Sequence, residues 1–364
     1  NSKKLSFSVD LFKLKKCNIY IATIPTPIKK NKTPDLKFIK QACSDIAKIL
    51  NKKDIVIFES TVYPGLTEEY CIPLIEKLSN LKGNKDFFYG YSPERINPND
   101  KIHTIKKIVK ITSGSNKKIS KFIDELYKKI ISAGTFKASS IKVAEAAKVI
   151  ENTQRDLNIA FMNELCVIFD KLNINTSEVL KAASTKWNFL NFKPGLVGGH
   201  CIGVDPYYLK HQSEKFGYKP KIINSGRNMN DDFIKFISNK AIKVTKNKFN
   251  IEHPRFLILG LTFKENCLDF RNSKSIELVK KIKKRKFIVH SFDPYLNKLN
   301  FKHFKSINFR SFIKKNFYHC IIITVSHNYF KKLGQKNISN YLVKNGLIFD
   351  IKNTLPKNNN NFYL

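Results

Sequence analysis

Three observations predict an α/β fold of two doubly wound domains joined by a long central helix. Over residues 16–91, short apolar runs alternate with stretches of helical periodicity in the order β-α-β-α-β, which is typical of a parallel sheet covered by helices. A second alternation of this kind begins near residue 256. Between the two, residues 139–172 keep an unbroken helical spacing of apolar side chains, which corresponds to a helix of about 50 Å.

The first domain is predicted to present a ligand crevice at the ends of its strands. Its first apolar run, residues 16–24, ends at Pro25-Thr26-Pro27, where the prolines must take the chain out of the sheet. The elements predicted after it are a helix over 35–50, a strand over 54–59, a helix over about 66–79 and a strand over 87–91. In an open α/β sheet the carboxyl ends of the strands face the ligand, so we expect Pro25 and Thr26 beside the crevice.

The long helix carries a pair of polar residues that are suited to chemistry. Ser139 or Ser140 can cap its N-terminus. Lys148 and Asn152 are spaced i, i+4, so they project from one face of the helix, one turn apart. A lysine in a site stabilises an oxyanion, and a neighbouring amide orients a water molecule. The alternative interpretation of Lys148 is a solvated surface lysine, as most lysines of so basic a chain must be.

A glycine-rich stretch, residues 198–206, places a cysteine and a carboxylate four positions apart. The adjacent glycines Gly198 and Gly199 permit a tight loop, so Cys201 is predicted on a loop and not on a regular helix. Asp205 is within plausible reach of the sulfur. A reactive thiol needs a partly exposed, electropositive setting, which His200 and the many lysines supply. The alternative is a buried structural cysteine on a glycine turn.

The remainder of the chain is predicted to form a second α/β domain. Residues 187–195 before the cysteine loop are aromatic and rich in turn formers, and they either face a substrate or tuck onto the core. A helix after residues 224–230 runs to about Lys246, and a change of composition over 247–253 marks a domain boundary. The elements predicted beyond it are strands over 256–261, 286–292, 318–325 and 346–351, and a helix over 274–285.

Length and composition are those of a water-soluble protein of several domains. The 364 residues are 42% hydrophobic, and no apolar run reaches the roughly 18 residues of a membrane span. The first residues show no signal-peptide pattern. The seven cysteines include no C-x-x-C pair and their number is odd, which favours reduced thiols over a zinc site or a disulfide framework. We therefore expect a cytoplasmic protein without membrane insertion and without a bound metal.

The net charge of +37 is extreme and comes from lysine. Only 7 of the 66 basic residues are arginine, whereas recognition of bases and phosphates in nucleic acids relies on arginine. The lysines are scattered through every segment, often beside asparagine, as in the low-complexity tail 357–364, which is predicted to be disordered. We expect no specific nucleic-acid partner, although a basic nucleic-acid-binding protein remains the alternative that the charge alone suggests.

Five separated motifs resemble, in the same order, those of the UDP-glucose/GDP-mannose dehydrogenase family. The stretch GGHCIGVDPYYL resembles the active-site loop of its branch that acts on UDP-N-acetylhexosamines, and Pro98 stands where the UDP-glucose enzymes carry a second glutamate. The resemblance covers residues from about 15 to about 353. The other motifs are Ser60-Thr61-Val62, Tyr91-Ser92-Pro93-Glu94-Arg95, residues 146–153, and G-L-T-F-K-E-N-x-x-D-x-R-N-S from Gly260 to Ser273.

This resemblance implies a domain plan, a reaction and a set of site residues. The implied domains are an NAD-binding Rossmann-like domain over 1–138, a small helical domain with the cysteine loop over 139–246, and a UDP-sugar-binding α/β domain over 247–356. The implied catalytic residues are Cys201, Lys148, Asn152, Asp205, Thr61 and Glu94. The implied cofactor-binding residues are Pro25, Thr26, Thr61, Glu94 and Arg271. The implied substrate-binding residues are Lys148, Asn152, Asn191, Gly198, Arg227 and Lys264. A homodimer or a higher homo-oligomer is also implied.

The implied reaction is a four-electron oxidation at C6 of UDP-GlcNAc or UDP-GalNAc, in which two NAD⁺ are reduced and a uronic acid is formed for surface polysaccharide. Cys201 would hold the intermediate aldehyde as a thiohemiacetal and then as a thioester. The sequence contains no G-x-G-x-x-G and does not begin with Met, so the first domain is expected to lack its first βαβ unit. The alternative that follows is a truncated, non-catalytic binder of nucleotide sugars.

Overall fold

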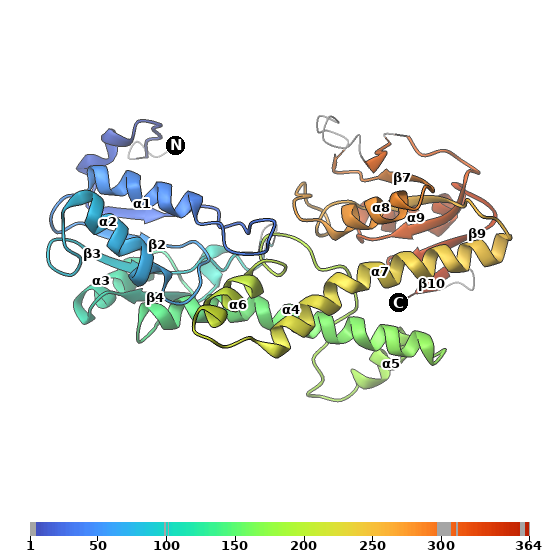
Figure 1. Ribbon diagram of the computed structural model, residues 1–364, viewed down its shortest axis with the longest axis horizontal. Helices are drawn as coiled ribbons and strands as arrows, with labels where there is room; N and C mark the ends of the chain where they lie inside the picture. Colours follow the sequence, from blue (N-terminus) through green and yellow to red (C-terminus); the bar gives the residue numbers. More distant parts are fainter. Residues whose placement is uncertain are drawn as a thin grey trace. The chain divides into compact units, whose positions relative to one another are not determined.

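The chain, in a computed structural model that describes residues 5–97, 100, 102–296, 307–310, 312–356 and 361–363, divides into two compact units (Figure 1). Unit 1 consists of Asn1–Thr153 together with Val204–Pro220, and unit 2 consists of Gln154–Gly203 together with Lys221–Leu364. Each unit contains one five-stranded sheet. The expected division into three consecutive domains stays a prediction.

The sheet of unit 1 has the strand order β1-β2-β3-β4-β5. Its strands are β1 (Ile19–Ala22), β2 (Ile55–Phe58), β3 (Phe88–Tyr91), β4 (Lys110–Gly114) and β5 (Thr135–Lys137). The first three strands are parallel and lie within the predicted ranges. The sheet is not parallel throughout, because β4 runs antiparallel to β3.

The helices of unit 1 cover both faces of this sheet. They are α1 (Lys37–Ile49), α2 (Ile72–Ser79), which continues a π-helical turn at Thr67–Cys71, α3 (Lys117–Lys128) and α6 (Asp205–Lys215), with short 3₁₀ turns at Leu11–Lys16 and Ile105–Lys107. Alternate residues of a strand point to opposite faces. Val56 and Phe58 of β2 accordingly pack with α1 and α2, whereas Ile55 and Ile57 pack with α3.

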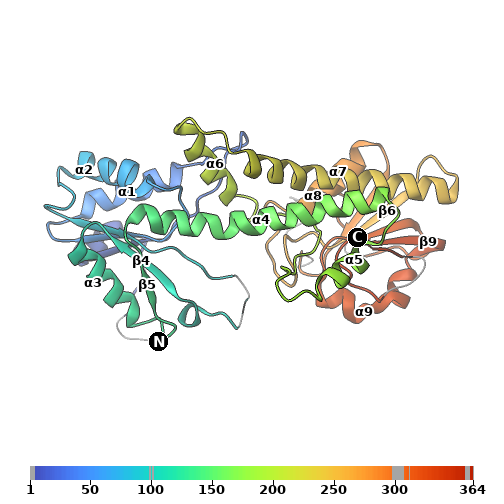
Figure 2. The same cartoon turned by 90° about the horizontal axis from the view of Figure 1, so that it is seen from below.

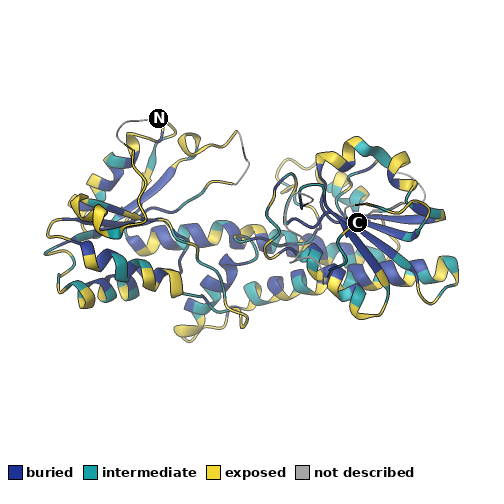
Figure 3. Cartoon of the chain, turned by 90° about the horizontal axis from the view of Figure 1, so that it is seen from above, coloured by how far each residue is buried: buried dark blue, intermediate teal, exposed yellow. Residues whose placement is uncertain are grey.

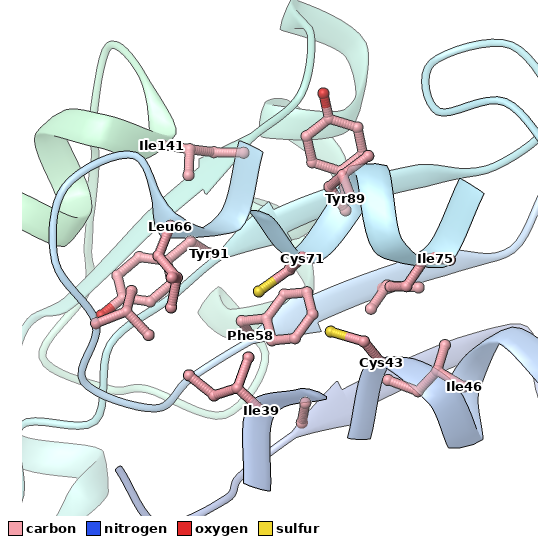
Figure 4. Close-up of a cluster of buried hydrophobic side chains, with 14 of the residues drawn as sticks. Ile39, Cys43, Ile46, Phe58, Leu66, Cys71, Ile75, Tyr89, Tyr91 and Ile141 are labelled. Carbon is pink, nitrogen blue, oxygen red and sulfur yellow. The ribbon is translucent and has the colours of Figure 1, made fainter. Parts of the chain in front are cut away.

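The core between the sheet and the first two helices is densely apolar (Figure 4). Phe58 lies beside two buried cysteines, Cys43 from α1 and Cys71 from the π-helical turn. Both cysteines occupy positions of small apolar side chains, which suits the weakly polar thiol group. Ile141, the first residue of the long helix, closes the same core, so this helix is anchored where it begins.

The long helix α4 (Ile141–Lys171) confirms the predicted span, and it begins after Ser140, whose hydroxyl accepts a hydrogen bond from the Val143 N–H at 3.2 Å. Its second half belongs to unit 2, as do α5 (Thr176–Ala183) and α7 (Lys221–Phe249). Helix α7 thus begins before residues 224–230, whereas the prediction placed its start after them, because Asn, Ser and Gly in this stretch are typical of a turn. Gly226 explains the difference, because a Cβ at this position would lie 2.3 Å from Leu157 Cδ2 of α4.

The sheet of unit 2 is parallel throughout, with the strand order β10-β9-β8-β6-β7. Its strands are β6 (Arg255–Leu259), β7 (Ile288–Phe292), β8 (Tyr318–Ile323), β9 (Leu342–Asp350) and β10 (Asn361–Tyr363). Helices α7 and α8 (Lys274–Lys284) pack on one face and α9 (Asn328–Ser339) packs on the other (Figure 2). The strands are buried along most of their length (Figure 3), as expected for a sheet covered on both sides.

The strand order places a ligand crevice in unit 2. The chain forms β6 first, then β7 on one side of it and β8 on the other, so the connections leave β6 and β8 in opposite directions. Ligands of open α/β sheets bind at the carboxyl ends of the strands where the order reverses in this way. The segments that follow β6 and β8 are therefore the candidates for ligand contact.

The end of the chain was expected to be a disordered tail. Its residues 357–360 and 364 lie outside the described residues, whereas Asn361–Tyr363 form β10 alongside β9, which differs from that expectation.

Among the described residues, no helix combines the length and the apolar character that crossing a membrane demands.

Gly260, directly after β6, is expected to be far less tolerant of alanine than another glycine with similar backbone geometry. Its φ is +92°, and a Cβ there would lie 2.9 Å from the backbone nitrogen of Val325. Gly134 has φ +85° but open space around it. We expect Gly134→Ala to lower the free energy of unfolding by about 1 kcal/mol and Gly260→Ala by about 2–4 kcal/mol. Urea unfolding of both variants measures this, and equal losses would contradict the close approach.

Candidate active site

The predicted cofactor residues of unit 1 gather at the carboxyl edge of β1, β2 and β3. The loop after β1 carries the exposed Pro25 and the half-buried Thr26. The Ser60 hydroxyl, after β2, donates to the Ile24 carbonyl at 2.6 Å and accepts from the Ile24 N–H at 2.8 Å, which ties the loop of Thr61 to the loop of Pro25. Three neighbouring strand ends thus present these residues at one edge.

The loop after β3 is tied to the same edge. The Glu94 N–H donates to the carbonyl oxygen of Glu59, the residue after β2, at 3.1 Å. The Glu94 carboxylate is half-buried and accepts a hydrogen bond from the Ile96 N–H. The backbone of Glu94 is therefore bonded to that of the residue two positions before Thr61.

A buried lysine that the sequence analysis did not single out supports both loops. Lys110 of β4 is 5% exposed, and its amine lies 3.2 Å from the Glu59 carboxylate and donates to the Pro93 carbonyl at 3.1 Å. The Tyr127 hydroxyl also donates to Glu59. A buried charge requires such partners. The sequence offered only a weak signal, a lysine at the start of a short strand whose other residues are uncharged.

Three predicted catalytic residues meet within unit 1. The Asn152 amide donates to Asp205 Oδ2 at 2.6 Å, and Lys148 Nζ lies 3.8 Å from the same oxygen. All three side chains are buried, so Lys148 is not a solvated surface lysine. Asp205 begins α6, and the following Pro206 occupies the first turn, where its missing N–H costs nothing. Burial raises the pKa of Asp205 to about 6, against the opposing effects of Lys148 and Asn152.

Glu145 lies one turn before Lys148 and fixes the chain that follows Thr61. Its carboxylate is fully buried and accepts the Gly65 N–H at 2.5 Å and the Thr67 N–H at 3.0 Å. Burial raises the pKa of this carboxyl to about 7, although the bonds from residues 65 and 67 oppose the shift. The sequence analysis missed Glu145, because its partners lie about 80 positions away in the chain.

Cys201 lies on a turn in unit 2 and is exposed, as a reactive thiol requires. Because Cys201 is exposed, the alternative of a buried structural cysteine does not hold for it, although five of the other six cysteines are buried. A Cβ at Gly198 would lie 2.6 Å from the carbonyl oxygen of Asn272, and a Cβ at Gly199 would lie 2.7 Å from the ring of Phe263. The two glycines therefore let the cysteine loop pack against residues 263–272.

An ion-pair cluster joins the cysteine loop to the same segment. His200 Nε2 lies 3.2 Å from Asp269 Oδ2, and Arg271 donates to the Asp269 carboxylate at 2.7–3.2 Å. Partial burial alone would raise the pKa of Asp269, but the Arg271 hydrogen bonds and the His200 ring lower it overall. The predicted cofactor residue Arg271 is thus an exposed side chain held by Asp269.

A cavity of about 540 Å³ opens in unit 2 beside the carboxyl ends of β8 and β9. It lies where the strand order predicts a ligand. Its lining includes the predicted residue Asn191 and Glu265, the neighbour of the half-buried Lys264. Four lysines and two aromatic rings are also part of the lining: Lys181, Lys193, Lys331, Lys352, Phe189 and Phe192.

The electrostatics of this cavity suit an anion. Desolvation lowers the pKa of the Lys352 amine, with the nearby charge of Glu265 opposing and that of Lys193 adding to the shift. An amine that lacks water around it gains most from a bound negative charge. Of the aromatic segment 187–195, which was expected either to face a substrate or to tuck onto the core, Phe189 and Phe192 line the cavity. Its Trp187 is 89% exposed.

Arg227 of α7 is buried, unlike a side chain that is exposed to a ligand. It is 4% exposed, and its guanidinium donates to Asp156 of α4 at 2.6 Å and to Asp231 at 3.1 Å. These buried ion pairs join α4 and α7 within unit 2, and a substrate contact of Arg227 stays a prediction.

The predicted site residues are divided between the two units. Unit 2 contains Cys201, Gly198, Asn191, Arg227, Lys264 and Arg271, and unit 1 contains Lys148, Asn152, Asp205, Thr61, Glu94, Pro25 and Thr26.

Comparison with known protein families identifies the class of enzyme that has this fold, the NAD-dependent dehydrogenases that act on sugar nucleotides. Three models of one protein family match consecutive parts of the chain: the NAD binding domain over residues 1–131, the central domain over 142–232 and the UDP binding domain over 257–357. The chain belongs to the UDP-glucose/GDP-mannose dehydrogenase family. The match to the NAD binding domain starts at residue 1, so the expectation that this domain lacks its first βαβ unit is not borne out.

Similar proteins of named activity cover nearly the whole chain. A UDP-N-acetyl-D-glucosamine 6-dehydrogenase of Salmonella typhi is 51% identical over 356 residues, which are 98% of this chain and 84% of that protein. A protein of the same name from Pseudomonas aeruginosa is 49% identical over 364 residues, 100% of this chain and 86% of its own. The solved UDP-D-ManNAc dehydrogenase of Pyrococcus horikoshii is similar with a TM-score of 0.83 at 27% identity, over 96% of this chain and 80% of that one.

The stability difference between the protein and a Glu145→Gln variant is expected to depend on pH. The pKa of Glu145 is raised from 4.5 to about 7, so the folded protein holds the proton more tightly than the unfolded chain. The stabilising contribution of Glu145 is therefore complete below about pH 4.5 and is lost as the pH rises through about 7, by roughly 3 kcal/mol in all. Urea unfolding of both proteins from about pH 4 to about pH 8 measures the difference, and a constant difference would refute this account.

Proposed function

We propose that the protein oxidises C6 of a UDP-N-acetylhexosamine to the carboxylic acid, with UDP-N-acetylglucosamine as the favoured substrate and NAD⁺ as the oxidant. The observation that carries the reaction is the exposed thiol of Cys201 on a glycine loop that is packed against segment 263–272 of the same unit. The choice of sugar rests on the two relatives at 51% and 49% identity, which are named for that substrate. UDP-N-acetylgalactosamine is the second candidate.

The lysine-rich cavity of unit 2 suits the UDP group. A diphosphate carries negative charge that the amines of Lys181, Lys193, Lys331 and Lys352 attract, and Phe189 and Phe192 offer apolar surface for a base. Asn191, also in the lining, supplies an amide for hydrogen bonds. We assign Lys264 and Gly198 to the same substrate, since their segments adjoin the cavity residue Glu265 and the cysteine loop.

The strand ends of unit 1 fit the nicotinamide end of NAD⁺. The Thr61 hydroxyl and the Glu94 carboxylate stand at the carboxyl edge where open α/β sheets bind ligands, and Pro25 and Thr26 stand at the end of the neighbouring strand. When bound, NAD⁺ supplies the two-electron oxidant for each of the two oxidation steps. The residues of the chain bind and orient it there.

The first oxidation requires a base for the proton of the C6 hydroxyl. Asp205, with a pKa of about 6, is largely ionised at neutral pH and still basic enough to accept a proton through an ordered water. The Asn152 amide, bonded to Asp205, orients the carboxylate. The Lys148 ammonium group stabilises the negative charge that develops on the substrate oxygen.

Cys201 carries the second half of the reaction. Its sulfur adds to the aldehyde carbon, the new C–S bond gives a thiohemiacetal, and the thiol proton passes to the former carbonyl oxygen. Oxidation of this adduct gives a thioester. Water then attacks the thioester carbon, the C–S bond breaks, the thiol regains a proton and the uronic acid leaves. Thr61 and Glu94 orient this water.

Activity measurements on Cys201 variants test the proposal. We expect the protein to reduce two NAD⁺ for each UDP-N-acetylglucosamine and Cys201→Ala to lose more than about 1,000-fold of acid formation, since the covalent step is then absent. Absorbance of NADH and chromatography of the uronic acid give both quantities. Cys17→Ala is the matched control, because Cys17 is the other exposed cysteine and is expected to be dispensable. Acid formation at the normal rate by Cys201→Ala would overturn the thioester step, and tight binding of UDP-sugar without any NADH would favour a non-catalytic binder.

We further propose that two copies of the chain associate through one face of α4. Large apolar side chains lie exposed along this helix at Val143, Ile150, Phe161 and Ile168, and at Leu172 directly after its end. Their spacings of seven, eleven and four residues return to the same side of a helix with 3.6 residues per turn. A stripe that runs the length of one helix is complementary to itself under a twofold axis, which favours a homodimer.

Charge placed in the stripe is expected to separate the dimer. Phe161→Glu puts a carboxylate into the apolar contact, and the mass of the protein in solution should fall to that of a single chain. Phe122→Glu on α3 is the control, because Phe122 is also an exposed helical phenylalanine, at 41% against 53% for Phe161. Size-exclusion chromatography with light scattering gives both masses. A dimer that persists in Phe161→Glu would exclude this face as the contact.

A further inference from the structure

A histidine and an aspartate at the ligand end of the unit 2 sheet form a buried pair that the proposed reaction does not use. His327 follows β8 and Asp293 directly follows β7, and both are 0% exposed. His327 Nε2 lies 3.1 Å from Asp293 Oδ2. Two polar groups without solvent, at the place where the strand order predicts a ligand, require an explanation.

The partners of His327 fix the tautomer of its ring. Nδ1 accepts a hydrogen bond from the Asn266 backbone N–H at 2.9 Å, so this nitrogen carries no proton. The proton is therefore on Nε2, which faces Asp293 Oδ2 and the Thr262 hydroxyl oxygen at 3.2 Å. The ring thus acts as an acceptor on one side and as a donor on the other.

These bonds hold both ends of the segment 261–266. At its start, Asp293 Oδ2 accepts the Leu261 N–H at 2.6 Å and the Thr262 N–H at 3.1 Å. At its end, His327 Nδ1 holds the backbone of Asn266. Asp293 and His327 are bonded to each other, so the two ends of the segment are held by one connected pair of side chains.

The middle of the segment contains Lys264 and the cavity residue Glu265. The Thr262 hydroxyl, which lies against His327, donates to the carbonyl oxygen of Lys264 at 2.9 Å. Glu265 lines the cavity, and so does Ser326, the neighbour of His327 in the chain. The backbone position of Lys264 is thereby coupled to the imidazole through a single hydroxyl.

We infer that His327 is a positioning residue of the nucleotide-sugar site: its ring, held by Asp293, fixes the segment 261–266 so that Lys264 and Glu265 stand ready at the cavity before the ligand arrives. The role rests on the proposed function, since it concerns the same substrate. It predicts that loss of His327 weakens binding of the nucleotide and leaves the chemistry at C6 intact, because none of its contacts reaches Cys201, Lys148, Asn152 or Asp205.

Three variants of His327 separate the two sides of the ring. The amide of His327→Asn retains an acceptor near the position of Nδ1, and that of His327→Gln retains a donor near the position of Nε2, whereas His327→Leu has neither. We expect the dissociation constant of UDP, measured by calorimetry, to rise about tenfold or more in His327→Leu and by less in the other two, as one or two buried hydrogen bonds are lost. KM for UDP-N-acetylglucosamine should rise in the same order, with kcat within about twofold of the unaltered enzyme.

A buried histidine elsewhere in the same sheet provides the matched control. His290 Nδ1 and the Tyr318 hydroxyl, both buried, are 2.9 Å apart, and Tyr318 lies at the opposite end of β8 from His327. Tyr318→Phe removes that bond, and we expect it to lower the thermal midpoint while UDP affinity stays unchanged.

The measurements distinguish the positioning role of His327 from a purely structural role. UDP affinity within twofold of normal in a folded His327→Leu protein would overturn the positioning role, and so would equal weakening by Tyr318→Phe. A fall in kcat at constant KM would also overturn it. Failure of the unaltered protein to bind UDP at all would instead overturn the proposed substrate site, and the role of His327 would fall with it.

Discussion

In each unit, a fully buried carboxylate binds the backbone of the loop on which the predicted site depends. Glu145 accepts the N–H groups of residues 65 and 67 after β2, and Asp293 accepts those of residues 261 and 262 after β6. A loop that leaves the end of a parallel strand has N–H groups without partners in the sheet. Burying such groups without a partner costs several kcal/mol, so an internal acceptor is a condition for a rigid loop at this edge.

The same constraint explains why the site tolerates so many buried charges. Lys110 is satisfied by the Glu59 carboxylate and the Pro93 carbonyl, and Asp205 is satisfied by Asn152 with Lys148 nearby. Burial opposes the charged form of Glu145 and Asp205 and raises the pKa of each, to about 7 and about 6. The raised pKa of Asp205 suits the proposed role of a base at neutral pH, whereas Glu145 accepts backbone N–H groups and holds the chain after β2.

The periodicity of the sequence was sufficient to predict most of the frame. Strands β1 to β3, the helix α4 and the strands β6 to β9 are long enough or apolar enough to stand out, and Ser140 marked the start of α4 correctly. The short strands β4 and β5 were not predicted, because Lys110 and Lys137 at their ends interrupt the apolar pattern. The start of α7 was placed too late, because Gly226 signals a turn in sequence and a close helix contact in space.

The site was predictable only where a motif carried it. The meeting of Lys148, Asn152 and Asp205 in unit 1 agrees with their expected shared role. Glu145, Lys110, Asp293 and His327 escaped notice, because each acts on backbone groups that are distant in the chain and that no local pattern connects to it. The contacts of Arg227 with Asp156 and Asp231 were not predicted either, and its substrate contact stays a prediction.

One segment of unit 2 connects the lysine-rich cavity with the loop that carries the thiol. Its first part, residues 261–266, is held by Asp293 and His327 and adjoins the cavity through Glu265. Its second part supports the cysteine loop through Asn272 against Gly198 and through Asp269 against His200. The two parts are bonded to each other, because the Phe263 N–H donates to the Asp269 carbonyl at 3.0 Å. The segment therefore supports the cavity and the thiol through different residues, 261–266 for the first and 269–272 for the second, so the proposed chemistry depends on this scaffold as well as on the thiol.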